Sequence, residues 1–172
     1  MRQPVDRERI RAFARALGRE ARRDTKLYLT GGASAVLRGW REATLDIDVR
    51  FEPEADELLL AVARLKNELD VNVELASPSD FIPELPGWRD RSPFVFREGR
   101  LDVHDFDFYS QALSKIERGF SQDLSDVAAM LRDGLVDRGR LKELFAEIEP
   151  SLFRYPAIDA GTFRAKVDRA LS

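Results

Sequence analysis

The sequence predicts a mixed α and β fold (α+β), in which a small mixed sheet is flanked by helices. Short apolar runs of strand length alternate with amphipathic stretches as far as residue 106. From residue 109 onward the apolar spacing is helical throughout. Strands mixed with helices, followed by helices alone, are typical of this class. We expect an α/β part at 1–108 and a helical part at 109–172, packed together as one compact unit.

The elements follow in order from apolar spacing and from glycine and proline breaks. Glu98-Gly99-Arg100 separates the last two strands and predicts a hairpin. After residue 109, breaks between helices are expected at Gly134, Gly139 and Gly161. The elements predicted before them are a helix at 5–23, a strand at 26–30, a helix at 33–40, a strand at 45–51, a helix at 54–69, a strand at 71–76, a proline-rich loop at 77–88, and strands at 93–96 and 101–106.

Composition limits the classes of protein that the chain can represent. Its 172 residues are 44% hydrophobic and 34% charged, which suits a globular protein. The absence of cysteine excludes disulfides, thiolate zinc sites and a cysteine nucleophile. No apolar run reaches the length of a membrane span or a signal peptide, so we expect a cytoplasmic protein with no membrane partner. The net charge of -3 gives no overall attraction to nucleic acid.

Two carboxylates stand one residue apart in the predicted strand 45–51. Side chains alternate along a strand, so Asp46 and Asp48 share one face, while Leu45, Ile47 and Val49 share the other. On an exposed edge strand the two acids would simply be solvated. Neighbouring carboxylates repel each other unless a positive group joins them. A hard divalent cation, Mg²⁺ or Mn²⁺, prefers such oxygen ligands, so we predict that Asp46 and Asp48 bind metal.

A glycine pair precedes this strand. Gly31-Gly32 lies between a predicted strand and a short helix, where residues without Cβ atoms let a ligand approach the backbone amides. The positive end of the following helix and the hydroxyl of Ser34 would face that ligand. A plain strand-to-helix turn is the alternative. In combination with the aspartate pair, the glycines predict a site that holds a triphosphate together with its metal.

These residues resemble a known signature. Gly31-Gly32, a short helix and then Thr44-x-Asp46-Ile47-Asp48 resemble the active-site motif of the polymerase-β-like nucleotidyltransferase superfamily. More narrowly, R-x-x-T-x-D-I-D from Arg41 to Asp48 resembles the AbiEii/MenT-type branch, which includes bacterial toxins of type IV toxin–antitoxin systems. The resemblance runs from about residue 26 to 133. Arg41 and Thr44 are assigned a supporting role in it.

The same branch has a later helical motif, a lysine followed by a basic residue and D-x-x-D. Here Lys115 and Arg118 precede Asp123 and Asp126. At about 100° per residue, Lys115, Arg118 and Asp126 form one polar stripe, and the apolar phase continues through residue 119, which predicts one helix or two collinear ones. We expect Lys115 to contact phosphate, Arg118 to pair with Asp126 or reach the nucleotide, and Asp123 to brace the helix. A solvated face of an ordinary amphipathic helix is the alternative.

The resemblance also implies a third carboxylate on a strand beside the aspartate pair, acting as general base or completing the metal site. By chain order the candidate is Glu74, with Asp102 as the rival. His104, the single histidine, is left out of the site, since one histidine cannot build a zinc centre. Trp88, in the proline-rich loop, is expected to pack there, to stack on a base or to cover a cleft.

Together these features predict a magnesium-dependent nucleotidyltransferase that moves a nucleoside monophosphate from an NTP to an unknown acceptor. The acceptor classes left open are tRNA, a protein side chain and a small molecule, and the resemblance adds a cognate antitoxin as a partner. A metal-dependent phosphoesterase would use the same acids but needs no glycine turn for a triphosphate. A catalytically silent binding module has no chemical reason to keep Gly31, Gly32, Asp46, Asp48 and Lys115 together.

Overall fold

The computed structural model of the chain describes residues 2–172, and these form two compact units. The first contains the described residues up to Ser77 together with Ser92–Phe106, and the second contains Pro78–Arg91 and Asp107–Ser172. The proline-rich segment therefore belongs with the helical part, whereas the sequence grouped it with the α/β part. None of the helices in residues 2–172 combines the length and the apolar character that crossing a membrane requires.

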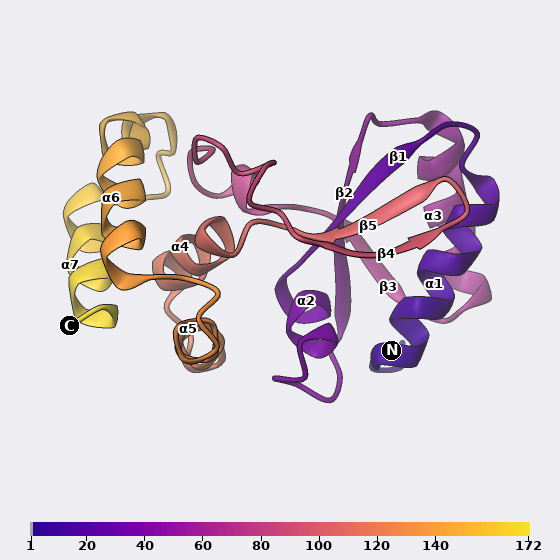
Figure 1. Cartoon of the computed structure of the whole chain (residues 1–172), viewed down its shortest axis with the longest axis horizontal. Coiled ribbons are helices and arrows are strands. Elements are labelled where there is room, and N and C mark those ends of the chain that lie inside the picture. The colour runs from indigo at the N-terminus through magenta and orange to yellow at the C-terminus, as the bar shows by residue number, and fades with distance from the viewer. Residues whose placement is uncertain (1) are drawn as a thin grey trace. The chain divides into compact units, whose positions relative to one another are not determined.

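The first unit is built on one mixed sheet of five strands, as the sequence predicts (Figure 1). The strand order is β3-β2-β1-β5-β4, in which β1 runs antiparallel to β2 and parallel to β5. β2 and β3 are parallel, and β4 and β5 form the expected antiparallel hairpin. The strands are β1 (Thr25–Thr30), β2 (Asp46–Glu52), β3 (Asn72–Leu75), β4 (Phe94–Glu98) and β5 (Leu101–Asp105).

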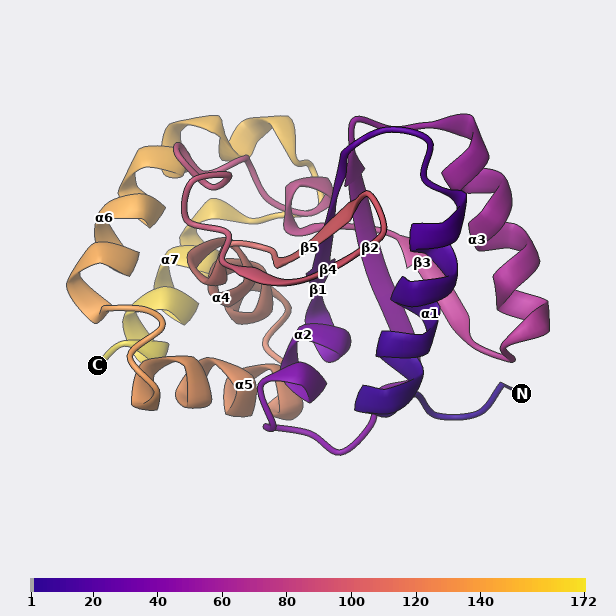
Figure 2. The same cartoon turned by 45° about the vertical axis from the view of Figure 1, so that its right-hand side comes forward.

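Three helices cover the apolar face of this sheet: α1 (Arg7–Glu20), α2 (Gly31–Leu37) and α3 (Asp56–Glu68). Figure 2 shows α1 and α3 side by side. Buried and half-buried residues alternate along the whole of β2, which confirms the period-two pattern. The strand begins at Asp46, however, and Leu45 is 65% exposed, so Leu45 does not share the core face with Ile47.

The second unit contains four α-helices, α4 (Phe108–Arg118), α5 (Ser121–Arg132), α6 (Arg138–Ile148) and α7 (Ala160–Ala170). The short 3-10 helices η1 (Pro78–Asp80) and η2 (Glu149–Arg154) also belong to it. The prediction of a single or collinear helix through residue 119 is wrong. Gly119 ends α4 in a left-handed conformation with φ of 74°, and the two helices follow different axes (Figures 1 and 2). Gly134 follows α5 as a break, whereas Gly139 and Gly161 lie within the first turns of α6 and α7.

Candidate functional site

The first glycine of the pair lies directly against the aspartate strand. Thr30 at the end of β1 pairs with Asp48 of β2, and Gly31 then opens α2 with φ of 62°. A Cβ atom placed on Gly31 would lie 2.8 Å from Oδ2 of Asp48. Any side chain here would therefore displace the carboxylate as well as strain the backbone. The glycine turn and the second aspartate, predicted separately to bind phosphate and metal, form one local structure.

The second glycine packs closely against the threonine of the same motif. A Cβ atom on Gly32 would lie 2.6 Å from Cβ of Thr44, closer still to its hydroxyl, and 3.4 Å from Nη1 of Arg41. The Thr44 hydroxyl donates to the backbone carbonyl of Asp46 at 3.2 Å, and its main chain exchanges two hydrogen bonds with Val5. Thr44 and Arg41 thus both lie close to Gly32.

The first aspartate and the candidate third carboxylate lie on neighbouring parallel strands. In the β2–β3 register, Asp46 is paired with Asn72 and Asp48 with Glu74, so all four side chains share one face. Nδ2 of Asn72 donates to Oδ1 of Asp46. Asp46 and Asp48 are half-buried and Glu74 is exposed. Across residues 2–172, no three His, Cys, Asp or Glu side chains are gathered closely enough to hold a metal ion.

Strand register separates the rival acid, Asp102, from this site. Asp102 is paired with Lys26 near the start of β1, whereas Asp48 is paired with Thr30 at its end. Four residues of strand correspond to about 13 Å, which is too far for a shared metal ion. Asp102 also forms a 2.8 Å ion pair with Arg97. Of the two candidates, Glu74 is the one that the sheet places next to Asp48.

Ser34, predicted as a phosphate contact, is fully buried and donates to Oδ1 of Asp105 at 2.6 Å. Arg38 completes the cluster, with Nε 3.0 Å and Nη2 2.8 Å from Oδ2 of Asp105. Burial raises the pKa of Asp105 above its ordinary 3.8, while Ser34 and Arg38 act in the opposite direction. This cluster fixes α2 behind the glycine turn, which favours a positioning role for Ser34.

Sequence reasoning missed Asp105, although a signal was present. Leu101, Val103 and Asp105 share one phase of strand β5, and the first two are fully buried. A carboxylate in the apolar phase of a strand must be neutralised by partners from elsewhere in the fold. The alternation along β5 therefore indicates that Asp105 is a charged residue at a buried position. Which residues of α2 neutralise it depends on the tertiary structure.

In the second unit, the motif of the helical region forms a buried ionic cluster. Nζ of Lys115 is 2.7 Å from Oδ2 of Asp126 and 3.8 Å from Oδ1 of Asp123. Arg118 contacts both carboxylate oxygens of Asp123, at 2.7 and 3.0 Å. Lys115, Asp123 and Asp126 are buried. The cluster joins α4 to α5, and Lys115 would have to leave Asp126 to contact phosphate.

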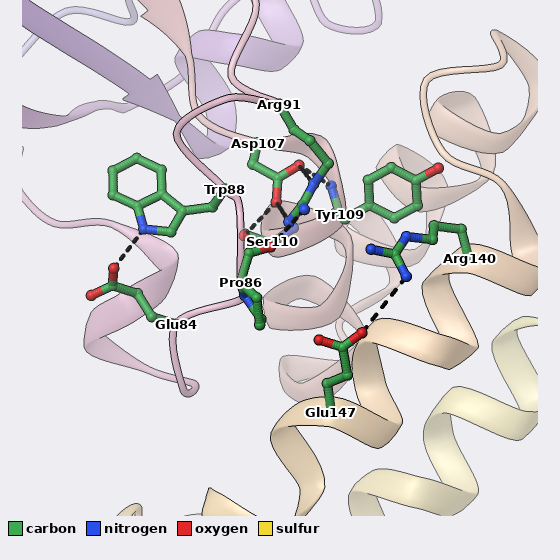
Figure 3. Close-up of polar contacts among 9 residues, drawn as sticks. All are labelled: Glu84, Pro86, Trp88, Arg91, Asp107, Tyr109, Ser110, Arg140 and Glu147. Carbon is green, nitrogen blue, oxygen red and sulfur yellow. Dashed lines mark hydrogen bonds and ion pairs between the residues drawn. The ribbon is translucent and has the colours of Figure 1, made fainter.

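The proline-rich segment is anchored in the second unit by a second buried carboxylate (Figure 3). Arg91 contacts both oxygens of Asp107, at 2.8 and 3.1 Å, and donates to the carbonyl of Pro86 at 2.6 Å. Asp107 also caps α4 through the amide and hydroxyl of Ser110. Trp88 is 2% exposed and its indole N–H donates to Glu84, so it packs in this segment, the first of the roles expected for it.

The geometry of the first unit thus brings five predicted residues together: Gly31, Gly32, Thr44, Asp46 and Asp48. The carboxylate oxygens of Asp46 and Asp48 are hard donors of the kind that Mg²⁺ and Mn²⁺ prefer. Oδ2 of Asp48 occupies the position that a side chain on Gly31 would take. Glu74 lies on the neighbouring strand, beside Asp48 in the register, but within residues 2–172 the three carboxylates are not gathered closely enough to hold a metal ion together. These residues fit a divalent cation with a phosphate ligand.

A family model described as "Nucleotidyltransferase of unknown function (DUF6036)" matches residues 8–163. This range includes the glycine pair, the aspartate pair, Glu74 and the ionic cluster of α4 and α5. Comparisons with curated proteins and with solved structures gave no match.

Proposed function

The chain belongs to this family of nucleotidyltransferases, and from that premise we propose that it transfers a nucleoside monophosphate from an NTP to an acceptor hydroxyl with the help of Mg²⁺ or Mn²⁺. The observation that carries the proposal is the contact between the glycine turn and the D-x-D strand. The carboxylate of Asp48 lies where a side chain on Gly31 would be, so the glycine turn and the D-x-D strand are in direct contact. A phosphate held by the turn would be next to the carboxylates.

In this proposal Asp46 and Asp48 would hold the cation through their carboxylate oxygens. When bound, the cation would neutralise charge on the phosphates and make pyrophosphate a better leaving group. The amides of Gly31 and Gly32 orient the β- and γ-phosphates. Arg38, Ser34 and Asp105 keep α2, and therefore those amides, in position. Asn72 holds the carboxylate of Asp46 through its amide.

The chemical step would be an in-line displacement. The acceptor oxygen forms a bond to the α-phosphorus, and the bond from that phosphorus to the oxygen bridging to the β-phosphate breaks. Pyrophosphate leaves with the bonding electron pair, and the acceptor proton passes to Glu74 or to water. Catalysis of this kind depends mainly on positioning and on charge neutralisation.

At a finer level, the R-x-x-T-x-D-I-D motif supports placing the chain in the AbiEii/MenT-type branch. On that basis we propose a cytoplasmic bacterial toxin of a type IV toxin–antitoxin system, with tRNA or a protein as acceptor and a cognate antitoxin. The sequence of the neighbouring gene is the simplest test of the antitoxin.

The activity itself is tested with each α-³²P-labelled NTP, Mg²⁺ or Mn²⁺, and total bacterial RNA and protein. We expect label to enter a macromolecule or a new small product, whereas γ-label should leave as pyrophosphate. In Asp46→Asn/Asp48→Asn, the loss of several kcal/mol of stabilisation corresponds to a fall of about a thousandfold or more. Label incorporation that is equal in the wild type and the double variant would contradict the proposal.

Two single variants make the test specific to the site. Glu74→Gln should lower the rate by about a hundredfold or more if Glu74 is the general base. Asp102→Asn removes an acid of strand β5 that is paired with the start of β1, away from Asp48. The transfer rate of this variant should therefore stay near that of the wild type. Release of monophosphate without incorporation would indicate a phosphoesterase, and no product of either kind would indicate a silent module.

A further inference from the structure

A groove with an apolar floor lies in the second unit, between α5, the end of α4 and α7. It encloses about 470 Å³. Its floor includes Ile116 of α4 together with Leu124, Val127 and Leu131 of α5. Space of this size, bounded by aliphatic side chains, is typical of binding sites. The proposed transferase chemistry uses none of these residues.

The groove follows one face of α5. Leu124, Val127, Ala128 and Leu131 have the i, i+3, i+4, i+7 spacing of a single helical stripe, which extends over about 10 Å. Leu124 is 43% exposed, and Phe120, next to the start of α5, is 65% exposed. The apolar surface therefore continues beyond the groove along the helix. Ala128 and Gly119 are small, so a partner's backbone could approach closely.

The rim of the groove is basic. Arg132, Arg138, Lys166 and Arg169 line it, and among the described lining residues there is no acid. Lys166 donates to the carbonyl of Glu117 at 2.6 Å, and Arg132 is 3.2 Å from the carboxylate of Asp133. Within residues 2–172, Arg138 and Arg169 have no ion pair with an acidic side chain. Two guanidinium groups thus remain available to carboxylates of an occupant.

From this arrangement we infer that the groove binds an acidic amphipathic helix of a partner protein. A helix with apolar residues at i, i+3, i+4 and i+7 would cover the stripe on α5, as in other helix-in-groove complexes. Glutamates or aspartates beside that stripe would reach Arg138 and Arg169. RNA would satisfy the cations but would leave the aliphatic floor uncovered, and a small anion would leave Phe120 and Leu124 exposed.

The probes are fluorescein-labelled helical peptides of about 14 residues, used with the full chain and read by fluorescence anisotropy. One panel carries leucines at the helical spacing with flanking glutamates, in several registers. A second panel replaces glutamate with lysine, and a third replaces leucine with serine. We expect the best acidic peptide to bind at least about tenfold more tightly than its lysine and serine counterparts, and less tightly as salt rises.

Three protein variants locate the binding. Arg138→Glu/Arg169→Glu should weaken the best acidic peptide at least about tenfold. Ala128→Phe, which fills the groove, should weaken it similarly. Arg89→Glu/Arg154→Glu makes the same change in net charge at exposed positions outside the groove and should leave the affinity unchanged. Circular dichroism checks that each variant keeps its helical content.

Several outcomes would overturn the inference. These are the absence of binding by any acidic peptide at about 100 µM, equal binding of acidic and basic peptides, and affinity that the groove variants do not change. Binding of dodecanoate or of an RNA oligonucleotide that only the groove variants abolish, with no peptide bound, would assign the groove to a different occupant. Self-association of the chain that Ala128→Phe abolishes would assign it to a second copy.

Discussion

The aspartates of β2 and those of α5 differ in how deeply they are buried. Asp46 and Asp48 are half-buried, next to an asparagine amide and a glycine. Asp123 and Asp126 are buried, in contact with Arg118 and Lys115. A buried carboxylate is tolerated only when nearby cations and hydrogen bonds neutralise it. The acids of α5 are therefore suited to holding two helices together, whereas those of β2 are only half-buried.

The largest stability effect should come from Lys115→Ala. Removing the ammonium group takes from the buried Asp126 the ion pair that Lys115 supplies, and breaking such a pair typically costs about 3–5 kcal/mol. The measurement is urea unfolding followed by Trp88 fluorescence in a Trp40→Phe background, because Trp88 belongs to the second unit. Lys142→Ala, at an exposed position of α6, should stay within about 0.5 kcal/mol.

Replacing both partners sharpens this test. Lys115→Met/Asp126→Leu removes both charges and should recover much of the stability lost in Lys115→Ala. If Lys115→Ala unfolds at the same urea concentration as the wild type, the ionic cluster is not structural. That result would favour the sequence-based prediction that Lys115 contacts phosphate.

An intermediate effect is expected from Gly32→Ala in the first unit. The added Cβ would lie 2.6 Å from Cβ of Thr44, and overpacking of this kind costs about 1–3 kcal/mol. Hydrogen exchange at the β1 amides should be faster in the variant, since the strand leads directly into the turn. In Gly161→Ala the new atom meets Asp159 at an ordinary 3.7 Å, so α7 should be unaffected or slightly stabilised. Unchanged exchange at β1 in Gly32→Ala would show that the turn is adaptable.

The smallest expected effect is a pH dependence at Asp105. Because burial raises its pKa in the folded state above 3.8, folded protein binds a proton more readily than unfolded chain does. Its contribution to stability is therefore greatest below pH 3.8, falls as pH rises toward the folded pKa, and is constant above it. Asp105→Asn cannot titrate. The free energy of unfolding of the wild type minus that of the variant should decrease over this window, and an increase would contradict the burial effect.

The sequence alone indicated the class of fold and the centre of the site because both depend on local pattern. Alternation in Ile47, Asp48 and Val49 determines which side chains share a face, whatever the neighbouring strands are. The hairpin at Gly99 and the helical spacing after residue 109 are local in the same sense. The G-G and T-x-D-I-D motifs are also short segments, so their residue types could be interpreted before their contact was known.

Only the tertiary structure decided the contacts between distant segments. Register places Glu74 beside Asp48 and Asp102 at the other end of β1, and one apolar pattern is compatible with either pairing. The left-handed Gly119 turns α5 away from the axis of α4, which pairs Arg118 with Asp123 although an ideal continuous helix aligns it with Asp126. Burial of Lys115 and Asp126 follows from the packing of several elements at once, and the polar stripe predicted from sequence did not indicate it. For Asp105 the phase of β5 indicated burial, but its partners on α2 depend on the tertiary structure.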